Sequence, residues 1–232
     1  EEMREIETSS RLYREGTALV MTASILFNVE TPSPETRAIT FIVEGGTLIT
    51  VRYAAPQPFR VFPVRLQSQP ELAVSAEMTL VGLLDAIIDR LADALEMVDN
   101  VVSALSKAVF APLEKDIPQV RNHRKQLEEI GINSIRCSKV DESLVGLSRL
   151  LTFLDSSLRQ TGHKDVRLRI KDLQRDLFSL SSYVERQSEK LQLMLDATLG
   201  MINIRQNAIM QVFSVVAVVS GVAIRRQWER EG

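Results

Sequence analysis

Cysteine, histidine and aromatic residues are all scarce in this sequence of 232 residues. The one cysteine, Cys137, cannot form an internal disulfide, and its presence fits a reducing compartment. The two histidines, His123 and His163, have no cysteine or histidine partner at metal-ligand spacing. Aromatic residues make up 5% of the chain, which argues against stacking platforms for bases. With 28 basic and 30 acidic residues, the chain also lacks the charge excess of a nucleic-acid binder, so we expect no nucleic-acid partner.

Motifs of enzyme active sites are missing as well. The pair Gly45-Gly46 lacks the rest of any P-loop or dinucleotide-binding pattern. No histidine lies near Ser9-Ser10 or Ser181-Ser182 in the sequence, and His123 lies among basic residues that are typical of a surface. The sequence therefore predicts a protein that is not an enzyme. The chain also begins without a methionine or a signal-peptide pattern, and we expect it to be a fragment of a longer protein.

The longest pattern in the chain is an uninterrupted helix over residues 166–224, which would be about 85–90 Å long. Apolar side chains recur every three or four positions, with two polar interruptions and no proline. The members of this apolar seam are Ile170, Leu173, Leu177, Leu180, Val184, Gln187, Leu191, Met194, Thr198 and Met201. After Asn207 follows the uncharged run IMQVFSVVAVVSGVAI. The pattern predicts a stalk over 166–208, an apolar segment over 209–224 and a charged tail over 225–232.

A second, polar stripe follows the same helix. Its members recur at spacings of three or four residues and therefore share one face. They are Glu185, Glu189, Gln192, Asp196, Gly200, Asn203, Asn207, Met210, Ser214, Ala217 and Gly221. Asn207 and Ser214 would be poorly placed against lipid and well placed against a polar lumen or symmetry mates. The alternative is that residues 185–203 are simply the solvated face of the stalk.

Residues 1–78 predict a partial α/β lobe. Its expected elements are an amphipathic helix, a buried strand, two strands of a hairpin around Glu44-Gly45-Gly46, and a short helix or turn packed on the sheet. In order, they cover residues 1–15, 17–27, 38–43, 47–53 and 56–70. These strands need more partners than the segment provides, so part of the lobe is expected to precede Glu1.

Residues 79–165 predict two long antiparallel helices. The first covers 79–110 and ends at Ala111-Pro112. The second begins near Leu113 or Pro118 and continues to Leu158, with Gly131 as a possible kink and Gly162 in the turn that leads to the stalk. The expected fold class is thus α/β plus long α-helices, with a very long helix at the C-terminus.

Two acidic pairs on these helices have a spacing that would suit a hydrated divalent cation. Asp85 and Asp89, and likewise Asp172 and Asp176, lie four residues apart on one helix face. The alternative is that each pair belongs to an ordinary solvated charged face, and both interpretations stay open.

Several segments, taken in order, form a recognisable pattern: EEMREIETSSRLY, AITFIVEGGTLITVRY, LLDAIIDRLADALE, SLVGLSRLLTFLD and LMLDATLGMINIRQNAIMQVFSVVAVV. Over about residues 1–219 the chain resembles the proteobacterial branch of the CorA magnesium-channel family. In that family an α/β/α cytosolic domain leads into long helices that assemble as a homopentameric funnel, and the stalk helix continues into the pore-lining first transmembrane helix. The resemblance implies a homopentamer in the bacterial inner (plasma) membrane, with most of this chain on the cytoplasmic side.

The same resemblance assigns pore roles to residues of the last helix. Asp196 matches an acidic pore-facing position, Asn207 a polar ring at the cytosolic mouth, and Met210 and Phe213 the hydrophobic gate region. From the stalk inward, the expected pore-lining residues are Asp196, Asn203, Asn207, Met210, Phe213 and Ala217. The polar stripe, found from spacing alone, passes through most of them, so the two arguments agree there.

The chain departs from the family pattern after Ser220. The family continues with prolines, a Gly-Met-Asn motif and a second transmembrane helix, whereas this chain reads SGVAIRRQWEREG. The apolar segment 209–224 spans about 24 Å as a helix, less than the roughly 30 Å hydrocarbon core. Arg225 and Arg226 at its far end oppose the positive-inside rule. We therefore expect an incomplete channel that does not conduct on its own, and a soluble helical scaffold with an apolar docking helix is the alternative.

Two further expectations concern the transported cation and the site that would sense it. The resemblance implies Mg²⁺, and other divalent cations such as Zn²⁺ or Co²⁺ are possible cargoes, because a zinc-transporting relative would have the same architecture. The family's regulatory cation site includes an acid after the first strand, and in that region this chain offers Asn28 and Glu30.

Overall fold

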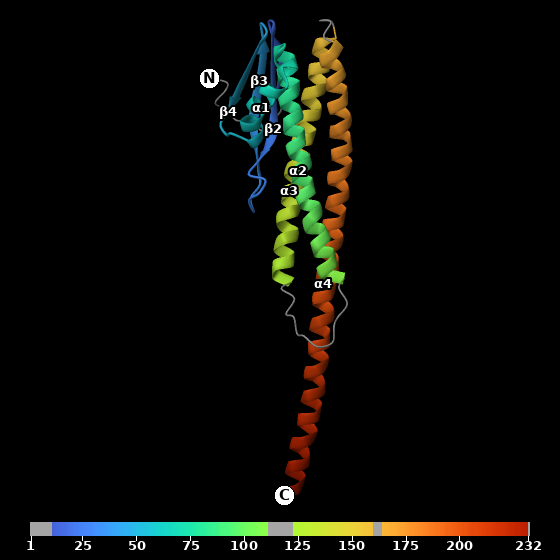
Figure 1. Ribbon diagram of the computed structural model, residues 1–232. Coiled ribbons are helices and arrows are strands. Elements are labelled where there is room, and N and C mark those ends of the chain that lie inside the picture. The colour runs from blue at the N-terminus through green and yellow to red at the C-terminus, as the bar shows by residue number, and fades with distance from the viewer. Residues whose placement is uncertain (1–10, 111–122, 160–163, 232) are drawn as a thin grey trace.

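A small antiparallel sheet lies beside a bundle of long helices in the computed structural model, which describes residues 11–110, 123–159 and 164–231 (Figure 1). The strands are β1 (Leu12–Glu15), β2 (Ala18–Phe27), β3 (Glu35–Glu44) and β4 (Thr47–Arg52). The helices are α1 (Gln57–Ser68), the 3₁₀ turn η2 (Pro70–Ala73), α2 (Ala76–Phe110), α3 (His123–Leu158) and α4 (Lys164–Glu231).

The sheet is a simple meander in the order β1-β2-β3-β4. Alternate residues of β2 and β3 are buried, as expected for strands with one face on a core. Met21 lies opposite Phe41 in the register, and both side chains are fully buried. Gly45 and Gly46 have positive φ values of 56° and 79°, which the tight turn between β3 and β4 requires.

The helices form the second and third layers. Helices α2 and α3 pack on the sheet, and α4 packs on α2 and α3 (Figure 1). The apolar seam of α4 supplies the contact: Ile170, Leu177 and Leu191 are all at most 2% exposed. Helix α4 has 68 residues, so at the helical rise it is about 100 Å long and extends well beyond the ends of α2 and α3 (Figure 1).

One sequence expectation is wrong in the N-terminal region. Residues 1–15 were expected to form an amphipathic helix, but Leu12–Glu15 is strand β1. It pairs with β2 in a register where Glu15 lies opposite Ala18, and Gly16 in the turn has a φ of 59°. Pairing with a neighbouring strand outweighs the weak helical pattern because a glycine at this position allows a tight turn. The remainder of that expected helix, residues 1–10, lies outside the described residues.

The other expected elements are present with small shifts. The strands expected at 17–27, 38–43 and 47–53 are β2, β3 and β4, and the short helix is α1. Helix α2 begins at Ala76 rather than at residue 79, because the Ser75 hydroxyl accepts a 3.1 Å hydrogen bond from the Met78 backbone N–H. Helix α3 runs through Gly131 without a break. Its expected start near residues 113–118 and the turn at residue 162 lie outside the described residues.

The expected division of the chain into lobe, helical pair, stalk, apolar segment and charged tail, with boundaries at residues 78, 165, 208 and 224, stays a prediction. Helix α4 continues through residues 208 and 224 without interruption, so its helical geometry marks neither boundary.

A buried arginine joins the sheet to the helical bundle. Arg136 of α3 is 6% exposed, and it donates hydrogen bonds to the carbonyl oxygen of Val29 at 3.0 Å and to that of Thr31 at 3.5 Å. It also donates a 2.5 Å bond to the side chain of Asn133. Burial lowers the pKa of the Arg136 guanidinium from its ordinary value, because the charged form is desolvated. The loop after β2 is therefore held to α3 by a charged donor.

Replacing Arg136 by methionine should lower the free energy of unfolding by about 2–3 kcal/mol, because buried carbonyl oxygens lose a charged donor. Urea denaturation followed by far-UV circular dichroism measures the change. The exposed Arg149 on the same helix provides the control, and Arg149→Met should change stability by no more than about 0.5 kcal/mol. Equal losses in the two variants would show that the contacts to the loop contribute nothing specific.

Candidate functional site

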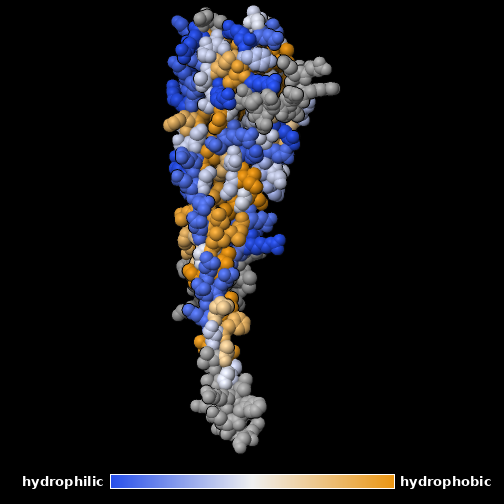
Figure 2. Space-filling view, turned by 180° about the vertical axis from the view of Figure 1, so that it is seen from behind, coloured by the Kyte–Doolittle hydropathy of each residue, from blue (hydrophilic) through white to orange (hydrophobic). Residues whose placement is uncertain are grey.

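The C-terminal half of α4 has no covering element among the described residues. From Asn203 to Ala217, every side chain whose exposure is described is exposed. The large apolar residues are included: Met210 is 66% exposed and Phe213 is 68% exposed. Figure 2 shows apolar side chains along the shaft of the bundle, and they continue onto the projecting part of α4. A contiguous apolar surface of this kind marks a site of association.

The expected pore-lining residues all lie on α4 and are not brought together within one chain. Asp196, Asn203 and Asn207 are exposed. The Gln192 side chain donates a 3.1 Å hydrogen bond to the Asp196 carboxylate along the helix. From Asp196 to Ala217 the helix advances about 32 Å, so these residues form a line rather than a cluster. Several copies around one axis would turn each position of this line into a ring.

The described part of the chain contains no helix with a segment both long and apolar enough to cross a lipid bilayer.

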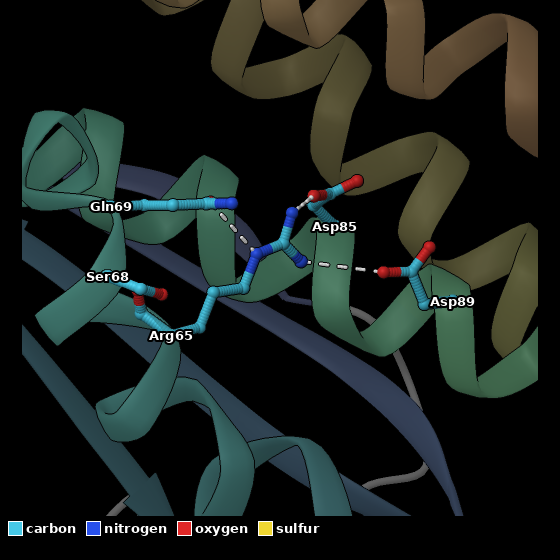
Figure 3. A network of polar contacts seen from close by, with 5 residues as sticks. All are labelled: Arg65, Ser68, Gln69, Asp85 and Asp89. Atoms are coloured by element: carbon cyan, nitrogen blue, oxygen red, sulfur yellow. Dashed lines mark hydrogen bonds and ion pairs between the residues drawn. The ribbon is translucent and has the colours of Figure 1, made fainter.

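The first acidic pair is occupied by an arginine. The Arg65 guanidinium of α1 contacts the Asp85 carboxylate at 2.5 Å and the Asp89 carboxylate at 3.4 Å (Figure 3). Its Nε donates a 3.1 Å hydrogen bond to the Gln69 side chain, which holds the guanidinium in place (Figure 3). Asp85 and Asp89 are therefore bridged by a cation of the chain itself.

The second acidic pair lies on α4, close to the first. The carboxylate of Asp176 is near enough to Asp89 to affect its ionisation. Burial raises the pKa of Asp89 above its ordinary value and Asp85 raises it further, while Arg65 opposes them and Asp176 adds to the repulsion. Asp172 contacts Arg175 at 3.1 Å. Within the described ranges no group of three or more His, Cys, Asp or Glu residues is arranged to hold a metal ion.

The loop suggested as a cation sensor also carries an internal ion pair. Glu30 contacts Arg90 of α2 at 2.8 Å, and Arg90 lies 3.6 Å from Asp93. Asn28 has a φ of 55°, a conformation that asparagine tolerates better than most residues. This loop is thus fixed by Arg90 and by Arg136.

Sequence analysis missed these arginines. The contact between Arg65 and Asp85 joins residues 20 positions apart in different elements, and no spacing rule connects them. Gln187 was noticed as a polar interruption of the apolar seam, but its partner was not. Its side chain is fully buried and donates a 2.6 Å hydrogen bond to Asp99 of α2. The interruption signalled a buried polar contact, and only the packing of α2 against α4 identifies it.

Asp89→Asn should stabilise the protein slightly at pH 7, by less than about 1 kcal/mol, because its side chain is 69% exposed and screened by solvent. The folded-state pKa is raised, so the ionised carboxylate opposes folding above that pKa and ceases to do so as the pH falls. The gain should therefore disappear below about pH 4. Thermal unfolding from pH 3 to pH 8 tests this.

Asp85→Asn serves as the contrast, because Asp85 makes the shorter contact with Arg65. It should destabilise the protein at pH 7. A loss of stability in Asp89→Asn of similar size would mean that attraction to Arg65 outweighs burial and repulsion at Asp89.

Comparison with known proteins gives concordant matches over nearly the whole chain. The model of the family described as "CorA-like Mg2+ transporter protein" matches residues 1–222. The magnesium transport protein CorA of Escherichia coli (strain K12) is 28% identical over 219 residues, which are 94% of this chain and 67% of that protein.

Solved structures agree in fold. The complete CorA magnesium transporter from Methanocaldococcus jannaschii superposes with a TM-score of 0.72 at 16% identity, covering 89% of this chain and 63% of that one. The ZntB cytoplasmic domain from Vibrio parahaemolyticus gives a TM-score of 0.63 at 11% identity, covering 86% of this chain and 75% of that one. Likenesses at this identity show the fold alone, and they confirm the expected class: a small sheet lobe followed by long helices.

Proposed function

The chain belongs to the CorA-like Mg²⁺ transporter family, and on this basis we propose that it forms the cytosolic funnel and the beginning of the pore helix of a divalent-cation channel. The family is one of transporters, and the expectation that the chain is not an enzyme is thereby confirmed. The proposed assembly is a homopentamer at the bacterial inner membrane, with most of this chain on the cytoplasmic side.

The observation that carries the proposal is the uncovered part of α4. Residues 203–217 expose apolar side chains together with the amides of Asn203 and Asn207, a combination that neither water nor lipid alone satisfies. A symmetric bundle of α4 helices resolves the conflict. Apolar side chains then face neighbouring helices and lipid, and the part of the polar stripe from Asp196 onward faces a common axis.

Rings of side chains on that axis would act on a cation in sequence. A ring of Asp196 carboxylates attracts cations and raises their local concentration. Magnesium holds its water tightly, so a ring of Asn207 amides would accept hydrogen bonds from the hydration shell rather than replace it. Met210 and Phe213 would form an apolar constriction that can close by dewetting. The cargo we propose is Mg²⁺, with Zn²⁺ and Co²⁺ as the competitors to be tested.

Asn207→Ala should alter cation uptake several-fold while assembly and the melting temperature stay nearly unchanged, because the amide is exposed and supports no fold contact among the described residues. Uptake of Mg²⁺, and of Co²⁺ and Zn²⁺ as competitors, is measured in cells that lack their own magnesium uptake and express a full-length version of this protein.

Asn100→Ala is the matched control, since Asn100 is an exposed asparagine on α2, away from the proposed pore. It should leave uptake unchanged. If Asn207→Ala prevents assembly while transport per assembled channel is preserved, Asn207 joins helices and does not line a pore.

Millimolar Mg²⁺ should stabilise the assembled protein through the predicted metal residues Asp172 and Asp176. A ligand that binds only the native state at ten times its Kd adds about 1.4 kcal/mol. Melting temperatures with and without MgCl₂, for the unaltered chain and for the double variant D172N/D176N, measure this contribution.

Sodium chloride at matched ionic strength separates binding from screening. Equal stabilisation by the two salts, or full retention of the magnesium effect in the double variant, would remove Asp172 and Asp176 as ligands.

A further inference from the structure

An open groove with both polar and apolar lining runs between α3 and α4. Its volume is about 530 Å³, and its lining includes Ser138 and Asp141 of α3 together with Ser181, Glu185 and Ser188 of α4. Asp141 and Glu185 are exposed. The α3 side of α4 therefore carries carboxylate and hydroxyl groups beside apolar side chains such as Val184 and Leu191.

The side of α4 toward α2 carries two basic residues, Arg186 and Lys190, at the same level. Gln187 and Lys190 both reach Asp99 of α2, at 2.6 Å and 3.4 Å, and this identifies the α2 side of the helix. The Arg186 guanidinium lies 5.6 Å from the centre of the Tyr183 ring. This cation–π contact holds the Arg186 side chain in position while leaving its charge exposed.

Lys190 already pairs with Asp99 at 3.4 Å, but other charges on the two sides have no such contact in the described part of the chain. Among the described residues, none of Asp141, Glu185 and Arg186 forms an ion pair. Glu185 and Arg186 are consecutive, and consecutive residues of a helix do not face each other. The carboxylates of Asp141 and Glu185 on one copy are complementary in charge to the guanidinium of Arg186 on another copy.

The angular relation between the two sides matches a ring. Consecutive residues on an α-helix point about 100° apart, and in a regular ring of five copies the directions to the two neighbours differ by about 108°. A head-to-tail ring uses two different surfaces of each copy, one for each neighbour. Glu185 and Arg186 point in directions that differ by about this angle, and they lie on two different surfaces of the copy.

We propose that the groove between α3 and α4 of one copy receives the α2 side of α4 of the next copy, so that Glu185 and Asp141 pair with Arg186 of the neighbour. This inference rests on the ring assembly of the proposed function and names the surfaces that close the ring. The occupant of the groove is a second copy of this chain.

Charge reversal with rescue is the first test. In mild detergent, Glu185→Arg and Arg186→Glu should each raise the protein concentration needed for half assembly by about tenfold or more, because each places like charges opposite one another in every interface. The triple variant D141R/E185R/R186E restores complementarity with all three signs exchanged and should assemble nearly as the unaltered chain does. Mass photometry measures the assembled fraction, and circular dichroism checks folding.

Glu128→Arg is the matched control, because Glu128 is exposed on α3 and does not line the groove. It carries the same change of charge and should assemble normally.

Cross-linking is a second test, and it does not depend on the stability of the charge-reversal variants. With the buried Cys137 replaced by serine, E185C and R186C chains are mixed and treated with a short bis-maleimide. We expect covalent dimers in the mixture and few in either variant alone. Dimers in E185C alone would indicate a two-fold contact and overturn the proposal. Assembled rings that form no cross-link in the mixture would show that the groove serves another partner, which also overturns it.

The outcomes separate the two proposals. If the unaltered chain stays monomeric over the whole concentration range, the ring of the proposed function is contradicted, and this interface with it. If the chain assembles and the reversal variants assemble equally well, the ring stands and only the assignment of its surfaces is wrong.

Discussion

The apolar seam of α4 is the contact on which the rest of the structure depends. Where α2 and α3 lie alongside, seam residues such as Ile170 and Leu191 are buried, and the helix is part of a three-helix bundle. Helix α2 ends at Phe110, and the described part of α3 begins at His123, but α4 continues to Glu231. A helix is stabilised in water mainly by packing its apolar face. Beyond the seam, the apolar side chains at the end of α4 have no such packing partner among the described residues.

Polar groups within the seam fix how α4 sits on α2. Gln187 is fully buried and donates to Asp99, and this hydrogen bond, more than the nearby Lys190, holds the pKa of Asp99 below its ordinary value. The stabilisation from this contact is present above the unfolded-state pKa of the carboxyl group and is lost as the pH falls through the lower, folded-state pKa. Shifting α4 by one turn would leave the buried amide without its acceptor, so the contact selects one register at the expense of some apolar packing.

Periodicity predicted the fold where one physical rule decides the structure. The spacing of the seam predicted α4, and the glycine turn between two strand-like segments predicted the hairpin of β3 and β4. The rule failed at Leu12–Glu15, where pairing with β2 competes with helix formation and no local pattern decides between them. It also could not identify Arg65 as the partner of Asp85, because that contact follows from the packing of α1 on α2. For the candidate pore, spacing places the residues on one face, but a pore requires several copies of that face.

Some charged side chains of the described residues are paired within the chain, and others are exposed without an ion pair. In and around the lobe, the carboxylates and carbonyl oxygens of Asp85, Glu30 and Val29 are contacted by Arg65, Arg90 and Arg136 in turn. Along the outer side of α4, Glu185 and Arg186 remain exposed without ion pairs among the described residues. The arginine contacts in the lobe make it rigid, because a guanidinium that donates to several acceptors fixes the position of each acceptor. Leaving the stalk unsatisfied makes its electrostatic energy depend on neighbouring copies. In the proposed assembly, the polar groups of the stalk and the apolar end of α4 would both find their partners in neighbouring copies.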